Sequence, residues 1–196
     1  MPKLSATARA RKIKLILFDV DGVLTDGKIW IFPAPTGQPA GSGASGLQSA
    51  SLIEVKGFHA HDGTAIMLAR MAGIKTGIIT KRNSETVALR ARDLKIDHVY
   101  QGIQDKASVL AQILQKDGIT AAEAAFVGDD VIDLPAMRQC GLAIAVKNAR
   151  PEVKAEAHYT TAHAGGDGAA RDAVEYILKA QGKWKTVVTE YVSQKD

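Results

Sequence analysis

From residue 13 onward, short apolar segments alternate with longer segments that mix apolar and polar residues. The short segments are predicted strands, each bounded by glycine or polar residues: 13–18, 76–80, 97–100, 124–127 and 142–146. Runs this short and apolar are typical of strands that are covered on both faces. Their alternation with helical segments predicts an α/β fold, a Rossmann-like parallel sheet flanked by helices. Ligands of such sheets bind at the carboxyl ends of the strands.

Capping residues help to set the helix boundaries. Helices are predicted over 64–72, 84–93, 106–116 and 169–180. Asn83 is a good N-cap for the second helix, and Asp105 precedes the third, which ends before Gly118. Thr120 and Glu123 have the spacing of a capping box, which predicts a further short helical turn.

One region interrupts this alternation. Segments 28–32 and 52–55 alternate like the two strands of a hairpin, so a protruding hairpin is predicted over 27–56. Between them, 15 of the 19 residues over 33–51 are Gly, Ala, Ser or Pro, which predicts a flexible tip. The 196 residues then divide into a basic N-terminal tail (1–12), a single domain (13–183) and a C-terminal tail (184–196).

Composition limits the cellular compartment and the classes of partner that can be expected for this chain. Cys140 is the single cysteine, so no internal disulfide can form, and a reducing, cytoplasmic location is expected. No segment approaches the ~18 apolar residues that span a bilayer, so no membrane partner is expected. The net charge is +4 and aromatic residues make up 5%. Basic and aromatic residues do not interleave, so no nucleic-acid partner is predicted.

The most informative motif follows the first predicted strand. Asp19 ends that strand, and Asp21 and Gly22 come next. Two carboxylates at one strand end repel each other unless a cation or a phosphoryl group lies between them. Such a pair can also divide labour, one group attacking and the other moving protons. A polar turn explains this motif alone about equally well.

Three further elements add to this pattern. Thr80 ends a strand close to the next helix N-terminus, where phosphate binds readily. Lys106 begins a helix, a position where a cation opposes the helix dipole. Its side chain is therefore either solvated or held there to bind a phosphate. Asp129, Asp130 and Asp133 follow another apolar strand, and such a cluster suits a hard cation such as Mg²⁺.

Together, these four elements resemble the haloacid dehalogenase-like phosphatase superfamily. The resemblance lies in the motifs and in their order along the chain: D-x-D-G-x-L-T-D, then apolar-apolar-Thr, then Lys, then G-D-D-x-x-D. The resemblance implies that Asp19 attacks phosphorus and forms an aspartyl-phosphate, while Asp21 acts as general acid and base. It implies that Thr80 and Lys106 bind the phosphoryl group. The implied Mg²⁺ ligands are the Asp19 carboxylate, the Asp21 backbone carbonyl and Asp129, and Asp130 supports them. Asp133 is implied to orient Lys106.

A narrower resemblance extends from residue 14 to about residue 183. Four features carry it: the hairpin, H-D-G at 61–63, L-K-I-D-H-V-Y-Q-G at 94–102 and A-G-G-x-G-A at 164–169. With these features the chain resembles the 3-deoxy-D-manno-octulosonate 8-phosphate (KDO 8-phosphate) phosphatases of lipopolysaccharide synthesis. The resemblance implies a capless phosphatase acting on a sugar phosphate, assembled as a homotetramer through the hairpins. The substrate-binding residues that it implies are Gly22, His61, Asp62, Gly63 and Arg82.

Departures from that family keep alternatives open. Lys81 stands where the family usually has Gly, His61 stands where Arg or Lys is common, and Asp167 stands where Arg is common. These positions bear on substrate choice, so a nine-carbon keto-sugar acid 9-phosphate or another sugar phosphate is the first alternative. A receiver-like phospho-acceptor module is a second alternative, although Asp129 follows Lys106 here, the reverse of the receiver order. A non-catalytic module on a phosphatase fold is the third.

Overall fold

The central feature of the fold is a parallel β-sheet. The computed structural model describes residues 4–33 and 52–193. Within these residues, six parallel strands are ordered β5-β4-β1-β6-β7-β8. They are β1 (Leu15–Phe18), β4 (Lys75–Ile79), β5 (His98–Tyr100), β6 (Ala124–Gly128), β7 (Leu142–Ala145) and β8 (Tyr159–Thr160). The predicted fold class is confirmed, and the five predicted strands lie within two residues of their expected bounds; β8 was not predicted.

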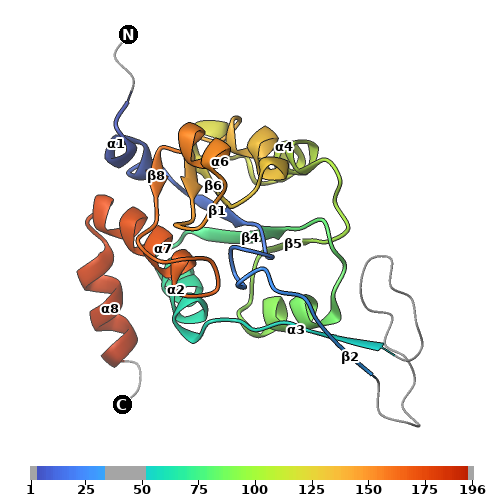
Figure 1. The fold of residues 1–196 in the computed structure, drawn as a ribbon. Helices are drawn as coiled ribbons and strands as arrows, with labels where there is room; N and C mark the ends of the chain where they lie inside the picture. Colours follow the sequence, from blue (N-terminus) through green and yellow to red (C-terminus); the bar gives the residue numbers. More distant parts are fainter. Residues whose placement is uncertain (1–3, 34–51, 194–196) are drawn as a thin grey trace.

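Helices cover both faces of this sheet. The described residues contain α1 (Ala6–Ala10), α2 (Ala60–Met71), α3 (Glu85–Asp93), α4 (Lys106–Asp117), α5 (Leu134–Met137), α6 (Pro151–Glu156), α7 (Ala169–Ala180) and α8 (Trp184–Ser193), with 3₁₀ turns η1 (Ala121–Glu123) and η2 (Val131–Asp133). In Figure 1, α2 and α3 lie below the sheet and α4 and α6 above it. Every residue of β1 is 0% exposed, because the strand has three others on one side, two on the other, and helices on both faces.

Two predicted helix starts differ from the structure. α2 begins four residues earlier than expected and runs through Gly63, a residue that disfavours helices. The absence of a side chain at Gly63 leaves room for the guanidinium of Arg90, which packs against the helix and which a Cβ at residue 63 would overlap. α3 begins at Glu85, and its extended N-cap residue is Ser84 instead of Asn83.

The two segments expected as tails contain helices. Ser5 caps α1, whose Ala10 is buried, and Arg9 donates to the Gly141 carbonyl at 2.7 Å. α8 packs on α2 and α7 and buries Val187. The Trp184 ring lies 4.9 Å from the Arg171 guanidinium carbon. These tertiary contacts order helices whose local sequence signals are weak.

The predicted hairpin is present beside the sheet. β2 (Trp30–Pro33) and β3 (Leu52–Val55) pair antiparallel, with Trp30 opposite Val55 and Phe32 opposite Ile53. These four side chains, which we call the apolar hairpin face, are 40–52% exposed. The predicted flexible tip lies outside the described residues, except for Pro33, which belongs to β2.

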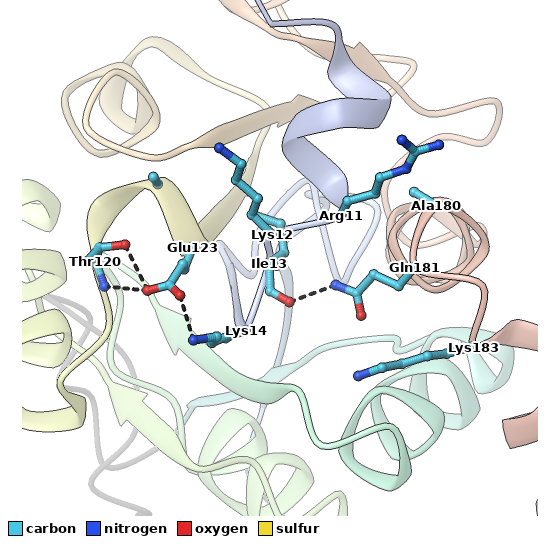
Figure 2. A pocket seen from close by; sticks show the side chains of 10 residues that line it. Arg11, Lys12, Ile13, Lys14, Thr120, Glu123, Ala180, Gln181 and Lys183 are labelled. Atoms are coloured by element: carbon cyan, nitrogen blue, oxygen red, sulfur yellow. Dashed lines mark hydrogen bonds and ion pairs between the residues drawn. The ribbon is translucent and has the colours of Figure 1, made fainter.

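The amino ends of the strands border a basic hollow of about 810 Å³ (Figure 2). Its acid, Glu123, pairs with Lys14 at 2.6 Å and accepts from Thr120, which confirms the capping box. Gln181, after α7, donates to the Ile13 carbonyl at 2.8 Å. These groups tie α1, η1 and α7 together. None of the helices in the described ranges is both long and apolar enough to span a bilayer.

At the opposite edge, a glycine loop after β8 packs directly on the loop after β1. The Gly166 amide donates to the Val23 carbonyl at 3.0 Å. A Cβ at Gly165 would overlap the carbonyl of Gly22, and φ of Gly166 is +70°. This close approach of two backbones requires glycine at both positions and fixes the loop that carries the first acidic motif.

Replacing Gly165 by alanine should therefore destabilise the protein by about 1–3 kcal/mol, because backbone must move to admit the methyl group. Thermal unfolding followed by circular dichroism measures this as a lower melting temperature. Gly57→Ala is the matched control, since a Cβ at Gly57 has no neighbour within 4 Å. Equal melting temperatures for the two variants would contradict the packing argument.

Candidate active site

Three polar residues follow neighbouring strands of the sheet at the same edge. Asp19 follows β1, Thr80 follows β4 and Asp129 follows β6. β1 pairs with both β4 and β6 in parallel, so the three residues meet where the strands end. The Asp19 amide donates to the Val127 carbonyl at 3.0 Å, which extends the sheet pairing to the first acid. The structure thus brings these three predicted site residues to one edge of the sheet.

Lys106 lies at the centre of the acids. Its ammonium is 2.9 Å from Asp19 Oδ1 and 2.6 Å from Asp133 Oδ1, and all three side chains are buried. Burial alone would lower the Lys106 pKa, but the two carboxylates outweigh it and raise the pKa above its ordinary value. The lysine is therefore a fixed cation inside the site, not a solvated side chain at the start of α4.

The acids themselves are shifted toward protonation. Burial, with repulsion from Asp133, raises the Asp19 pKa to about 6, although Lys106 opposes the shift. Burial and the charges of Asp133, Asp19 and Asp130 raise the Asp129 pKa to about 7. Crowded carboxylates of this kind hold a site for positive charge.

Asp133 fixes the second acidic loop from within. Its Oδ2 accepts the backbone amides of Asp129 at 3.0 Å and Asp130 at 3.4 Å, and the side chain is fully buried. A Cβ at Gly128 would lie 2.6 Å from the Cβ of Asp133, so glycine is required where the loop turns back on β6. Asp133 thereby links the loop backbone to the Lys106 ammonium, as the sequence resemblance implied.

The oxygen atoms suit a hard divalent cation. One carboxylate oxygen from each of Asp19, Asp129 and Asp133 lies within 4.8 Å of the others. Oδ1 of Asp129 is buried without a hydrogen-bond partner. Gly22, at φ +87°, leaves this carboxylate room, since a Cβ there would overlap it. An all-oxygen set with an orphaned buried carboxylate atom fits Mg²⁺. Asp130 is exposed in the lining of the site, and its Oδ1 caps the Val131 amide at 2.7 Å.

The acids open into a hollow of about 500 Å³. Its lining combines predicted residues with others that the sequence analysis did not single out for the site, and comprises Asp19, Asp21, Gly27, Thr80, Lys81, Arg82, Gln104, Asp129, Asp130 and Ile132. Thr80 is buried and lines the hollow together with the acids. The hollow thus combines carboxylates with cations, an arrangement that can hold a phosphate ester beside a nucleophilic carboxylate.

Three predicted substrate-binding residues are not brought to this hollow. His61, Asp62 and Gly63 lie in the first turns of α2, and His61 lines a separate hollow with His163 and Asp167. Asp62 is buried and accepts the Arg171 amide at 2.8 Å, and Gly63 abuts Arg90. Within the described residues, Asp62 and Gly63 join α2 to its neighbours, and their contact with substrate stays a prediction.

Sequence reasoning missed two charged residues of β3 and its end. Lys56 forms an ion pair with Asp21, and Glu54 forms one with Arg82. The alternation of charge at 54 and 56 within an apolar hairpin was the available signal, because residues two apart share one face of a strand. Nothing local indicates that this face turns toward the acids.

Comparison with known proteins agrees with this geometry. Residues 78–171 match the model of haloacid dehalogenase-like hydrolases. The chain is 39% identical over 176 residues to the 3-deoxy-D-manno-octulosonate 8-phosphate phosphatase KdsC of Escherichia coli K12. The aligned residues cover 90% of this chain and 85% of the relative.

Solved structures give the same result. The enzyme of that name from Moraxella catarrhalis, in complex with magnesium, phosphate and KDO, has a TM-score of 0.82 at 35% identity, over 95% of this chain and 97% of that one. A probable YrbI family phosphatase from Pseudomonas syringae has a TM-score of 0.84 at 37% identity, over 95% and 97%. With the acidic edge, the buried lysine and these relatives, the chain belongs to the 3-deoxy-D-manno-octulosonate 8-phosphate phosphatase family of haloacid dehalogenase-like hydrolases.

Proposed function

We propose that the protein is a Mg²⁺-dependent phosphatase that hydrolyses 3-deoxy-D-manno-octulosonate 8-phosphate through an aspartyl-phosphate, a step in making lipopolysaccharide precursor. The observation that carries the proposal is the Lys106 ammonium held between Asp19 and Asp133 beside the orphaned Asp129 carboxylate. This is the charge pattern that phosphoryl transfer needs, and family membership supplies the substrate class.

In the first step, a carboxylate oxygen of Asp19 attacks phosphorus and the bond from phosphorus to the sugar oxygen breaks. Asp21, in its protonated form, gives its proton to the leaving alkoxide. Lys106 and the Thr80 hydroxyl contact the phosphoryl oxygens and stabilise their charge. Asp133 contributes by holding Lys106 in place.

In the second step, Asp21, now a carboxylate, takes a proton from water, and the water oxygen bonds to phosphorus. The bond from phosphorus to the Asp19 oxygen breaks, which restores the carboxylate and releases inorganic phosphate. When bound, Mg²⁺ neutralises negative charge between nucleophile and phosphate. Asp19, Asp129 and the Asp21 backbone carbonyl would hold it, with Asp130 supporting the loop.

For the sugar itself, we assign recognition to the two cations at the rim of the hollow. Lys81 and Arg82 line it together with Gln104. We assign the substrate carboxylate to Arg82, because its guanidinium lines the hollow and has N–H donors besides the one that pairs with Glu54. A cytoplasmic location is supported by the single cysteine of the sequence, which favours a reducing compartment.

Assembly as a homotetramer is supported by the apolar hairpin face. Trp30, Phe32, Ile53 and Val55 project from two paired strands and remain 40–52% exposed in one chain. An exposed apolar surface of this kind on a two-stranded sheet, which is marginal alone, favours burial against copies of itself. Packing of four hairpins would cover it.

The substrate proposal predicts Mg²⁺-dependent phosphate release, measured as kcat/KM. The value for KDO 8-phosphate should exceed those for a nine-carbon keto-sugar acid 9-phosphate and for a hexose phosphate by about a hundredfold. Asp19→Asn should abolish turnover because an amide cannot attack, whereas Asp26→Asn, an exposed acid of the same motif, should remain active. Similar values for all three esters would contradict the substrate assignment, and turnover by Asp19→Asn would contradict the mechanism.

The metal proposal predicts a pH-dependent stabilisation by Mg²⁺. In the metal-free protein, the Asp129 pKa of about 7 exceeds the ordinary 3.8, so the folded state binds the proton more tightly. The contribution of Asp129 to the free energy of unfolding is therefore fully present below about pH 4 and is lost as the pH rises through about 7. Mg²⁺ at a hundred times its Kd should raise the melting temperature by about 5–10 °C at pH 7.5 and by less at pH 5.5.

Asp129→Asn should remove both the loss of stability with rising pH and the stabilisation by Mg²⁺, because an amide carries no negative charge for the cation to neutralise. The metal-free variant should melt above the wild type at pH 7.5, and Mg²⁺ should leave it unchanged. Asp93→Asn, at an exposed acid on α3, serves as the control. The metal assignment is wrong if Mg²⁺ stabilises Asp129→Asn as strongly as the wild type.

The assembly proposal predicts that sedimentation velocity gives four protomers for the wild type. Phe32→Lys with Ile53→Lys places two charges on the apolar hairpin face and should dissociate the assembly, since a buried unpaired charge is costly. Leu89→Lys, at an exposed apolar residue of α3, should leave it intact. A wild-type monomer, or an unchanged double variant, would count against the hairpin as the interface.

A further inference from the structure

Four charged side chains form a closed ring beside the hollow. The Lys56 ammonium pairs with Asp21 Oδ1 and lies 3.3 Å from Glu54 Oε1. Arg82 pairs with Glu54 Oε2 and lies 3.7 Å from Asp21 Oδ2. Each cation therefore has an anion on both sides, and the ring has no net charge.

Burial is greatest on the hairpin side of this ring. The Lys56 side chain is 1% exposed and that of Glu54 is 8% exposed, whereas Asp21 and Arg82 reach the hollow. Burial acts to raise the Glu54 pKa, but Arg82 and Lys56 hold it below its ordinary value. A buried lysine is strongly disfavoured unless it is paired, so its position is fixed by these partners.

The strand alternation explains how β3 supplies both charges. Glu54 and Lys56 are two residues apart and point to one side, while Ile53 and Val55 lie on the apolar hairpin face. The hairpin thus reaches the acid that follows β1, although the two segments are separated by more than thirty residues of sequence.

We propose that Lys56 is a positioning residue for proton transfer, which fixes the Asp21 carboxyl group toward the leaving oxygen while Glu54 holds Lys56 and Arg82 in place. The inference rests on the role of Asp21 in the proposed function. A carboxyl group has freedom about two side-chain bonds, and proton transfer requires it within hydrogen-bond reach of the reacting oxygen. The ammonium on Oδ1 removes that freedom and leaves Oδ2, 3.7 Å from the Arg82 guanidinium, as the oxygen that can exchange the proton.

Leaving-group dependence separates positioning from a structural role. An alkoxide leaves poorly without a proton, whereas p-nitrophenolate needs little protonation. Lys56→Met should therefore lower kcat/KM about a hundredfold for KDO 8-phosphate and less than about threefold for p-nitrophenyl phosphate. Lys56→Arg should recover part of the loss. Lys28→Met is the matched control, since Lys28 is an exposed lysine before the same hairpin, and it should behave as wild type.

A double variant tests whether Lys56 acts through Asp21. In an Asp21→Asn background, Lys56→Met should cause no further loss on the sugar phosphate, because the group that it positions is gone. If Lys56→Met does not fold, as judged by thermal unfolding, Glu54→Gln replaces it. That variant loosens Lys56 without removing it and should lower kcat/KM about tenfold on the sugar phosphate alone.

Equal losses on the two esters, no loss on either, or additive losses with Asp21→Asn would each overturn the inference. Failure of the proposed function looks different. Wild-type protein would then not hydrolyse KDO 8-phosphate, and the comparison would be made with a hexose phosphate as the alkyl ester. Wild-type protein inactive on every ester would overturn both.

Discussion

The site depends on one buried ammonium group. Lys106 lies between Asp19 on the loop after β1 and Asp133 on the turn after β6, so it joins the two acidic loops through a single atom. Without that charge, carboxylates from neighbouring strands would face one another in a poorly solvated edge, where repulsion is strong. Asp133 passes the constraint on to the backbone amides of Asp129 and Asp130. The geometry of the acidic edge therefore rests on one lysine at the start of α4.

Sequence predicted most of this edge because the relevant signals are local. Short apolar runs locate β1, β4 and β6, and parallel pairing brings their carboxyl ends together without further information. The residue that follows each strand is then placed by the strand itself. Lys106 and Asp133 were also found, since their positions at the start of a helix and after a strand are recognisable along the chain.

The remaining part of the site arises from contacts that no local pattern specifies. Lys56 and Glu54 belong to a short hairpin, and only the packed structure shows that one face turns toward Asp21. For His61 the motif is recognisable along the chain, but its place in the fold is not: α2 carries it to a different hollow, and its contact with substrate stays a prediction. α8 was missed as a helix because its stability comes from packing of Trp184 and Val187.

β3 presents two chemically different sets of side chains on its two sides. Glu54 belongs to the charge ring, whereas Ile53 and Val55 belong to the apolar hairpin face. Because side chains alternate strictly along a strand, inserting or deleting one residue within β3 would exchange the two sets and place carboxylate outward and aliphatic groups toward the acids. Length changes over 34–51 leave this alternation intact, since they fall between the paired strands. The alternation therefore constrains the length of β3 itself, whereas it places no constraint on the length of chain between the two strands.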